Sequence, residues 1–377
     1  RKSKGQCQYC QSLFLHIINS PLSSILQSYV IFYKVISIYS ISNIFQFSYN
    51  PASGFFFYGL LHFMYNLFEF VYLGVGMLPP AIIERLVSFM WIADRWKDYE
   101  VLDCSGGEKL ERWGDFLLIR PDPQVIWETP KENRGWRRPN GHYHRSAKGG
   151  GEWEFFDLPE QWSIHYKELT FNLKPLSFKH TGLFPEQAAN WDWFGDRIRN
   201  AGRPIKVLNL FAYTGGATLA AAAAGASVTH VDASKGMVAW AKENSRSSGL
   251  ENAPIRWIVD DCVKFVEREI RRGNHYDGII MDPPSYGRGP KGEIWKIETS
   301  IYPFVQLCTK LLSDNPLFFL INSYTTGLAP SVLTYMLSTE VASTHGGTVK
   351  SDELGLPVTR TGLVLPCGAS GRWESGK

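Results

Sequence analysis

The chain has 377 residues, of which 44% are hydrophobic, and a formal net charge of +3. This length is typical of about two domains, and the composition is sufficient for a hydrophobic core. Residues 1–89 hold five basic and two acidic side chains, so they carry the whole +3, and residues 90–377 are neutral. The charge therefore excludes a protein held on nucleic acid by a global basic field.

The first 89 residues differ in composition from the rest. Residues 11–50 contain no Ala, Gly, Asp, Glu or Arg, and residues 55–78 are apolar and aromatic apart from Glu69. Such a composition is typical of translated A+T-rich non-coding DNA, so we expect residues 1–89 to be a spurious upstream extension. The alternative is a membrane anchor, because residues 55–78 are long enough to span a bilayer. The sequence does not support a cleaved signal peptide.

The six cysteines are scattered, as in proteins of the reducing cytoplasm, where we expect this protein. Cys7 and Cys10 form a lone C-x-x-C with no second pair, which is a weak zinc signal. No metal site is expected.

Residues 90–175 predict a small β-rich (α+β) domain. Short strands are predicted at 116–120, 153–156, 163–166 and 169–173, and the last of these alternates as a half-buried strand should. Between them, residues 131–148 carry a local charge of +5, with Trp136 and Tyr143 interleaved. Basic groups bind phosphates and aromatic rings stack on unpaired bases, so Arg137, Arg138 and Arg145 are candidate RNA contacts. The alternative is a solvated basic loop. His142 and His144 are expected to belong to this surface rather than to bind a metal.

Residues 176–377 predict a catalytic domain with an α/β doubly wound sheet. Apolar runs near 206–210, 227–232, 255–260, 277–282 and 317–322 alternate with helical patterns near 217–224, 234–247, 262–272, 299–312 and 330–338. This alternation indicates parallel strands joined by helices. Ligands of such sheets bind at the carboxyl ends of the strands.

A cofactor site is predicted at those carboxyl ends. The first strand runs into a turn with Gly215 and Gly216, where backbone can approach a cofactor, and Asp232 closes the next strand 17 residues after Gly215. A carboxylate there is suited to ribose hydroxyls, although it is often only a helix cap. Ser234 could cap instead and leave Asp232 free. Asp260 and Asp261 close the third strand, and one of them could equally cap the helix that follows.

The fourth strand ends in Asp282-Pro283-Pro284-Ser285-Tyr286. Two prolines fix the backbone, so the Asp282 side chain is held rigidly where it can accept a hydrogen bond from an amino group or a ring N–H. Tyr286 is placed to stack on a base, and the alternative is core packing. Residues 287–293 are expected to form a flexible basic loop, plausible as a lid, in which Arg288 would meet phosphate.

Taken together, Phe178–Gln187, Leu210–Gly216, Asp232, Asp260-Asp261 and Asp282–Tyr286 resemble the class I S-adenosylmethionine-dependent methyltransferases. The chain is most similar to the bacterial enzymes that methylate bases of 23S ribosomal RNA. The resemblance covers roughly residues 95–375. It implies a Rossmann-like fold, S-adenosylmethionine as cofactor, and large-subunit ribosomal RNA as partner. Terminal antiparallel strands at 345–352 and 361–367 would complete the sheet.

The resemblance also implies roles for particular residues. Catalysis would involve Asp282, Pro283, Pro284 and Tyr286. Asp261 is favoured over Asp260 for the adenine amino group. Thr181, Gly182, Phe184 and Gln187 would close over the methionyl end, although the residues by themselves indicate only a helix entry. The cofactor-binding residues would be Thr181, Phe184, Gln187, Asn209, Phe211, Ala212, Tyr213, Thr214, Gly215, Gly216, Asp232, Ala233, Ser234, Asp260, Asp261, Cys262 and Asp282.

One departure from the relatives bears on the methylated atom. Cytosine-C5 enzymes use a cysteine nucleophile, which in the relatives follows the fifth strand, whereas residues 318–327 contain no cysteine. Transfer to a nitrogen is therefore favoured over transfer to carbon. Three alternatives remain: a protein or small-molecule acceptor, a nicotinamide-dependent oxidoreductase, and an RNA-binding protein without catalysis.

Overall fold

The computed structural model describes residues 90–146, 150–176, 178–288, 294–325 and 327–376, with Arg288 described by its backbone only. The proposed extension or anchor, residues 1–89, lies outside the described residues. Across the described ranges, every helix is too short or too polar to cross a membrane.

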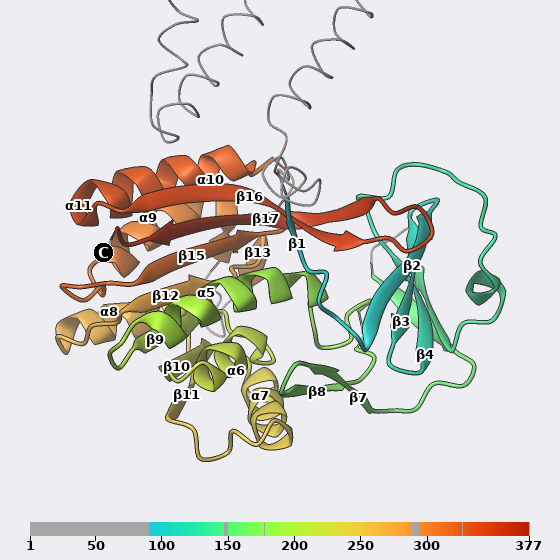
Figure 1. Cartoon of the computed structure of the whole chain (residues 1–377), viewed down its shortest axis with the longest axis horizontal. Helices are drawn as coiled ribbons and strands as arrows, with labels where there is room; N and C mark the ends of the chain where they lie inside the picture. The colour runs from blue at the N-terminus through green and yellow to red at the C-terminus, as the bar shows by residue number, and fades with distance from the viewer. Residues whose placement is uncertain (1–89, 147–149, 177, 289–293, 326, 377) are drawn as a thin grey trace, which may run out of the picture. The chain divides into compact units, whose positions relative to one another are not determined.

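An eight-stranded sheet forms the centre of the described unit (Figure 1). Five neighbouring strands are parallel, while β17 runs antiparallel between β15 and β16, and β1 pairs in parallel with β16. In spatial order the strands are β1 (Met90–Ile92), β16 (Thr348–Pro357), β17 (Val364–Glu374), β15 (Phe318–Ser323), β12 (Gly278–Met281), β9 (Lys206–Leu210), β10 (Ser227–Asp232) and β11 (Ile255–Val259).

The strands at the centre of this sheet are buried on both faces. Val207 and Ile280 belong to one hydrophobic cluster, while the next residue of the first strand, Leu208, and the preceding residue of the second, Ile279, belong to the other. Successive side chains of a strand point to opposite faces, so continuous apolar runs are required here. This explains why the strand positions are evident in the sequence.

Helices cover both faces of the sheet. The first cluster contains residues of α5 and α6, and the second contains residues of α8, α9 and α10. The helices are α5 (Ala188–Asn200), α6 (Gly216–Ala223), α7 (Lys235–Ser247), α8 (Cys262–Arg271), α9 (Ile297–Thr309), α10 (Pro330–Leu337) and the short α11 (Ser343–His345), with a 3₁₀ turn η2 (Pro185–Gln187) and a π turn η3 (Ser338–Ala342). The predicted doubly wound class I methyltransferase fold is confirmed.

The terminal strands and one helix differ from the prediction. β16 and β17 are longer and lie further along the chain than expected, and β17 is inserted beside β15. No range was predicted for helix α5, but it begins directly after the turn η2, where a helix entry was expected. Met90–Ile92, placed by sequence at the start of the small domain, adds an edge strand to the large sheet.

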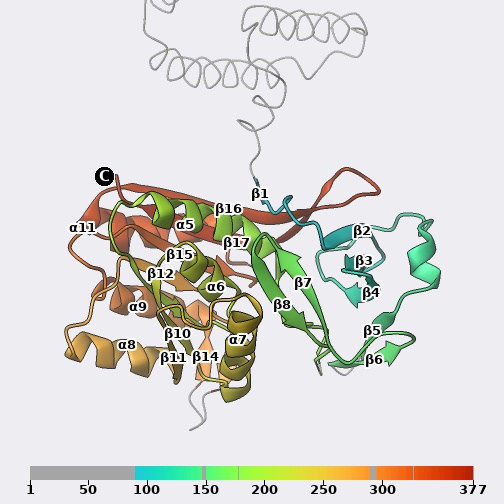
Figure 2. The same cartoon turned by 60° about the horizontal axis from the view of Figure 1, so that its bottom comes forward.

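A smaller five-stranded sheet precedes the catalytic fold. Its strands follow the order of the chain and are antiparallel except for β4 and β5. They are β2 (Tyr99–Ser105), β3 (Glu108–Trp113), β4 (Phe116–Pro121), β5 (Gly141–Arg145) and β6 (Gly151–Phe155). A hairpin of β7 (Trp162–Tyr166) and β8 (Leu169–Leu173) follows and packs on α7, where Trp240 Nε1 donates to the Asn172 carbonyl (2.9 Å; Figure 2).

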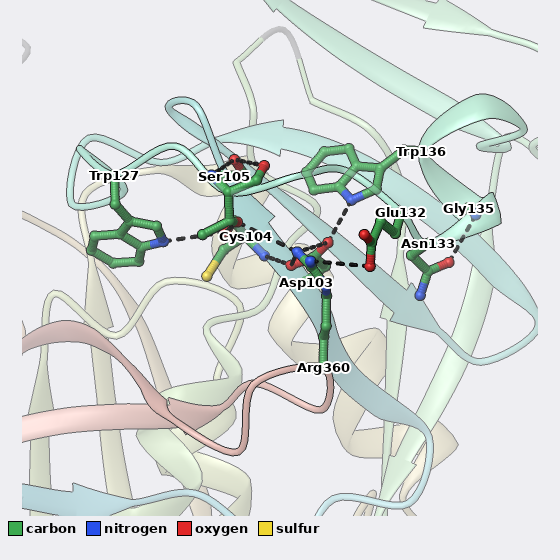
Figure 3. Close-up of polar contacts among 10 residues, drawn as sticks. Asp103, Cys104, Ser105, Trp127, Glu132, Asn133, Gly135, Trp136 and Arg360 are labelled. Carbon is green, nitrogen blue, oxygen red and sulfur yellow. Dashed lines mark hydrogen bonds and ion pairs between the residues drawn. The ribbon is translucent and has the colours of Figure 1, made fainter.

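The tip of the β16–β17 hairpin is hydrogen-bonded to the small sheet. The Thr359 amide donates to the Val101 carbonyl (2.9 Å), and Arg360 pairs with Asp103 at 3.4 Å. Figure 3 shows that Asp103 also accepts from the indole of Trp136, at 2.8 Å. The 3₁₀ turn η1 (Arg134–Arg137), which contains Trp136, is thereby fixed on the same carboxylate as the hairpin tip.

A buried ionic cluster lies inside the small sheet. Glu111 is fully buried and accepts from Arg120 (2.6 and 2.8 Å) and from Tyr99 (2.7 Å), with Lys109 Nζ at 3.5 Å. These cations and hydrogen bonds outweigh burial and hold the pKa of Glu111 at about 2.

Replacing Glu111 with Gln is expected to lower the free energy of unfolding by about 3–5 kcal/mol, because it leaves Arg120 buried without its partner. The pKa of Glu111 is lowered by folding, so its stabilisation is present above pH 4.5 and is lost as the pH falls toward 2. Urea unfolding of the wild type and Glu111→Gln across this range measures both effects. The exposed Glu128→Gln is the control, and equal losses in both variants would contradict the assignment.

Candidate active site

A pocket lies at the carboxyl edge of the parallel strands. Leu210 pairs with both Val231 and Met281, so the segments that follow β9, β10 and β12 leave the sheet side by side. The pocket has about 440 Å³ of empty space, its open mouth included. It is lined by Leu183, Phe184, Gln187, Trp191, Asn209, Phe211, Ala212, Tyr213, Thr214, Gly216, Ala217, Ile280, Asp282 and Asn322.

Eight of the wall residues just named, besides Asp282, are among those expected to bind the cofactor. They are Phe184, Gln187, Asn209, Phe211, Ala212, Tyr213, Thr214 and Gly216. The wall also includes residues that sequence reasoning missed: Leu183, Trp191, Ala217, Ile280 and Asn322. Of these, Asn322 had a usable signal, because it is a polar residue near the carboxyl end of a parallel strand.

The turn after β9 is conformationally strained. Phe211 and Tyr213 have positive φ (55° and 50°), which is uncommon for residues other than glycine, and Gly215 has φ of 89°. A Cβ on Gly215 would lie 2.9 Å from that of Ala241, and one on Gly216 would lie 2.7 Å from the Trp191 ring. The two glycines are therefore required by helix packing and backbone conformation. Their expected role at the cofactor, where a side chain would block close approach, stays a prediction.

Two buried hydroxyls next to the pocket lack protein partners. Tyr213 Oη and Thr181 Oγ1 form no hydrogen bond with any residue that the structure describes. Unsatisfied buried polar groups cost about 1–3 kcal/mol each, so such groups call for a ligand or water. Thr181 is among the residues expected at the methionyl end, and Tyr213 is among those expected to bind the cofactor.

Asp232 is held by backbone groups at the end of β10. It accepts from the amides of Tyr213 (2.9 Å) and Ser234 (2.8 Å), and burial raises its pKa. Ser234 caps α7 by accepting from the Met237 amide, so the cap is supplied by serine, as expected. A carboxylate has about four acceptor positions, so Asp232 retains two for ribose hydroxyls.

Both aspartates after β11 already have partners within the protein. Asp261 caps α8 by accepting from the Lys264 amide (3.0 Å), as the capping alternative predicted. Asp260 accepts from the Asp261 amide and pairs with Arg268. Cys262 is buried with its sulfur accepting from the Phe211 amide (3.3 Å), which ties this turn to the strained turn after β9. Ala233, after β10, is exposed.

Asp282 lies on the pocket wall, partly buried, near the buried acid Glu186. No described residue hydrogen-bonds to its carboxyl group. Burial and the nearby Glu186 raise its pKa to about 7. Glu186 is 5% exposed, and burial raises its pKa too. Sequence reasoning missed Glu186, although it is a carboxylate directly before Gln187 in the Phe178–Gln187 motif.

Gln187 is anchored by a buried polar network. Its side-chain oxygen accepts from Asn190 (2.9 Å) and Asn322 (3.0 Å), and its nitrogen donates to Tyr324 (2.7 Å). Asn190 in turn accepts two hydrogen bonds from Arg372. The network fixes two pocket-lining amides, so Gln187 has little capacity left for a ligand.

The segment after Asp282 forms a hairpin, which the sequence did not predict. β13 (Tyr286–Arg288) pairs with β14 (Ile294–Lys296), so residues 287 and 288, expected to begin the basic loop 287–293, lie in a strand. Residues 289–293 of that loop and the side chain of Arg288 lie outside the described residues. Tyr286 is 50% exposed, which argues against core packing. Pro283 is buried, and the Pro284 carbonyl accepts from Trp295 (2.7 Å).

Each cysteine of the described ranges has a raised pKa, chiefly through burial. The thiolate is the nucleophilic form, so none of these cysteines is activated. Cys367 was expected to end the last strand, at 361–367. It lies within β17 instead. It is close enough to Glu186 for that charge to raise its pKa.

The candidate RNA-contacting residues of the small sheet are separate from the pocket wall. Arg137, Arg138 and Arg145 are exposed. Tyr143 is 3% exposed and packs edge-on against Trp153, so the expectation that its ring stacks on a base was wrong. Trp136 is held by Asp103 and covered by Lys131, whose Nζ lies 4.2 Å from the ring centroid.

An open parallel sheet with a polar pocket at its carboxyl edge is the architecture of class I methyltransferases. Residues 133–326 match the family described as S-adenosylmethionine-dependent methyltransferase. A methyltransferase of that description from Agrobacterium tumefaciens, known from its crystal structure, is 38% identical, covers 76% of this chain and 94% of its own, and has a TM-score of 0.72. The chain belongs to the S-adenosylmethionine-dependent methyltransferases.

Curated relatives carry a more specific name. The ribosomal RNA large subunit methyltransferase K/L of Pseudoalteromonas atlantica is 34% identical over 61% of this chain and 35% of its own. That of Shewanella frigidimarina is 34% identical over 38% of this chain and 20% of its own. The chain spans only about a third or less of the length of these relatives. The family match leaves the nicotinamide-dependent alternative without support.

Binding of S-adenosylmethionine is expected to strengthen roughly five- to tenfold between pH 6 and 8. The sulfonium is cationic and Asp282 becomes anionic above its pKa of about 7, so their attraction grows with pH. Calorimetric titration measures this, with the uncharged thioether S-adenosylhomocysteine as the control ligand.

Asp282→Asn should remove most of this pH dependence, and Glu186→Gln should move its midpoint to lower pH by removing a like charge. Equal pH dependence for the two ligands would contradict the assignment.

Proposed function

We propose that this enzyme methylates a nitrogen of a base in RNA, with large-subunit ribosomal RNA as the substrate. The observation that carries the proposal is the Asp282 carboxyl, which lies on the pocket wall without a hydrogen bond from any described residue. Such a group can accept from the amino group or ring N–H of a base. The names of the curated relatives support ribosomal RNA as the substrate.

Bound S-adenosylmethionine would supply an electrophilic methyl group. Thr181, Tyr213 and Asp232 would hold it through the acceptors and hydroxyls described above. The base nitrogen would attack the methyl carbon with its lone pair, the carbon–sulfur bond would break toward sulfur, and S-adenosylhomocysteine would leave. The pocket would contribute orientation and exclusion of water.

Nitrogen is proposed over cytosine C5 because C5 chemistry needs a cysteine thiolate. The raised pKa of every described cysteine supports this choice. Tyr286, exposed beyond the second proline, is proposed to stack on the target base, and Arg288 to meet phosphate.

Two parts of the chain would divide the work. Residues 176–377 are proposed to carry cofactor binding and transfer. Residues 90–175 are proposed to present the RNA, through Arg137, Arg138 and Arg145. Residues 1–89 are proposed to contribute to neither.

Methyl-labelled S-adenosylmethionine, unmodified large-subunit RNA and, separately, a protein extract test the proposal. Label is expected in the RNA as an N-methylated nucleoside. Asp282→Ala should reduce transfer at least a hundredfold while the protein still binds S-adenosylhomocysteine, because the oriented acceptor is lost. Label only in protein would overturn the substrate, and C5-methylcytosine would overturn the choice of nitrogen.

Replacing Arg137, Arg138 and Arg145 together with Ala is expected to weaken RNA binding. The slope of log K against log salt should fall by about 2, since each lost phosphate contact removes about 0.7 for single strands. Cofactor affinity should not change. The control removes three exposed arginines elsewhere, Arg199, Arg246 and Arg271. Equal effects of both triple variants would show that only net charge matters.

A further inference from the structure

Three potential metal ligands lie on one face of the small sheet. His142 and His144 are two residues apart in β5, so their side chains point to the same face. Glu154 of β6 pairs directly with His142, which places it on that face as well. Ligand atoms of the three side chains all lie within 4.8 Å of one another, and the two imidazole centroids are 3.9 Å apart.

Hydrogen bonds already orient the ring nitrogens. His144 Nε2 lies 2.8 Å from a Glu154 oxygen, and His142 Nε2 lies 2.7 Å from an oxygen of Glu108, in β3. In the His144–Glu154 pair a proton lies between a nitrogen and an oxygen, and both of these atoms can bind a metal ion. A metal ion can replace such a proton with little rearrangement of the side chains.

The donor set selects the kind of ion. Two imidazoles and one carboxylate are the ligands of open zinc sites, whereas calcium and magnesium prefer oxygen ligands alone. The His142 and His144 side chains are 21% and 47% exposed, and Glu154 is 53% exposed, so water can reach a remaining coordination position.

Simple ion pairing explains the cluster less well. Exposed pairs contribute only about 0–1 kcal/mol, and two charged imidazoles at this separation would repel each other. Neutral imidazole is the form that binds metal. His165 provides a contrast, because it is paired with Asp98 alone and belongs to no such cluster of the described residues.

We propose that His142, His144 and Glu154 bind one divalent transition-metal ion of the zinc type. Glu108 orients His142 from outside the ligand set, as carboxylates commonly do for metal-bound histidines. The ion joins the neighbouring strands β5 and β6. This site is independent of the proposed RNA methylation.

Zinc binding is tested by calorimetry on the untagged full chain after dialysis against a chelator. The background carries Cys7→Ser and Cys10→Ser, because this C-x-x-C could compete for the metal. Binding of one Zn²⁺ per chain is expected. His144→Ala and Glu154→Ala should each weaken it by more than about tenfold, and Glu108→Gln by about tenfold. His165→Ala is the matched control and should leave it unchanged.

Cobalt provides a second measurement, since four-coordinate Co²⁺ absorbs visible light more strongly than the hydrated ion. An absorption band that appears with the parent chain and is lost in His144→Ala supports the site. The variant replaces an exposed side chain, and its circular dichroism is compared with that of the parent. Absence of stoichiometric zinc binding, or binding equally strong in His144→Ala, overturns the proposal.

Discussion

Parallel pairing of β9 with both β10 and β12 is the constraint on which the site depends. Leu210 is in register with Val231 on one side and Met281 on the other, so three turns emerge at one edge. The strained turn after β9, Asp232 and Asp282 come together for this reason. Residues far apart in sequence meet in the pocket because the pairing of the strands sets the distances between them.

Hydrogen bonding within the turns determines what the pocket can hold. Asp232 ties the Tyr213 and Ser234 amides together, and Cys262 accepts from the Phe211 amide, so the strained conformation is supported from two sides. Two acids, the buried Glu186 and the partly buried Asp282, make this region favourable for a cation, which fits a sulfonium cofactor.

The small sheet is joined to the catalytic fold by a shared hydrophobic cluster and by polar contacts. The β16–β17 hairpin reaches β2 through backbone hydrogen bonds and through the Arg360–Asp103 pair. The same carboxylate accepts from Trp136, so residues 131–148 are held in place near their start. Arg137, Arg138 and Arg145 of this segment are exposed. The Glu111 cluster keeps charged side chains inside this sheet. Removing the partner of any one of them would lower the stability of the folded protein.

The sequence by itself determined the alternating strands and helices, because strands buried on both faces require continuous apolar runs and helices require their own period. It also located Gly215, Asp232 and Asp282, since polar residues at strand ends follow directly from that pattern. Tertiary structure alone decided which groups are free. Asp261 caps a helix, Gln187 is held by Asn190 and Tyr143 is in the core, while Glu154 meets two histidines from a neighbouring strand. These outcomes depend on contacts between residues far apart in the chain, which no local pattern encodes.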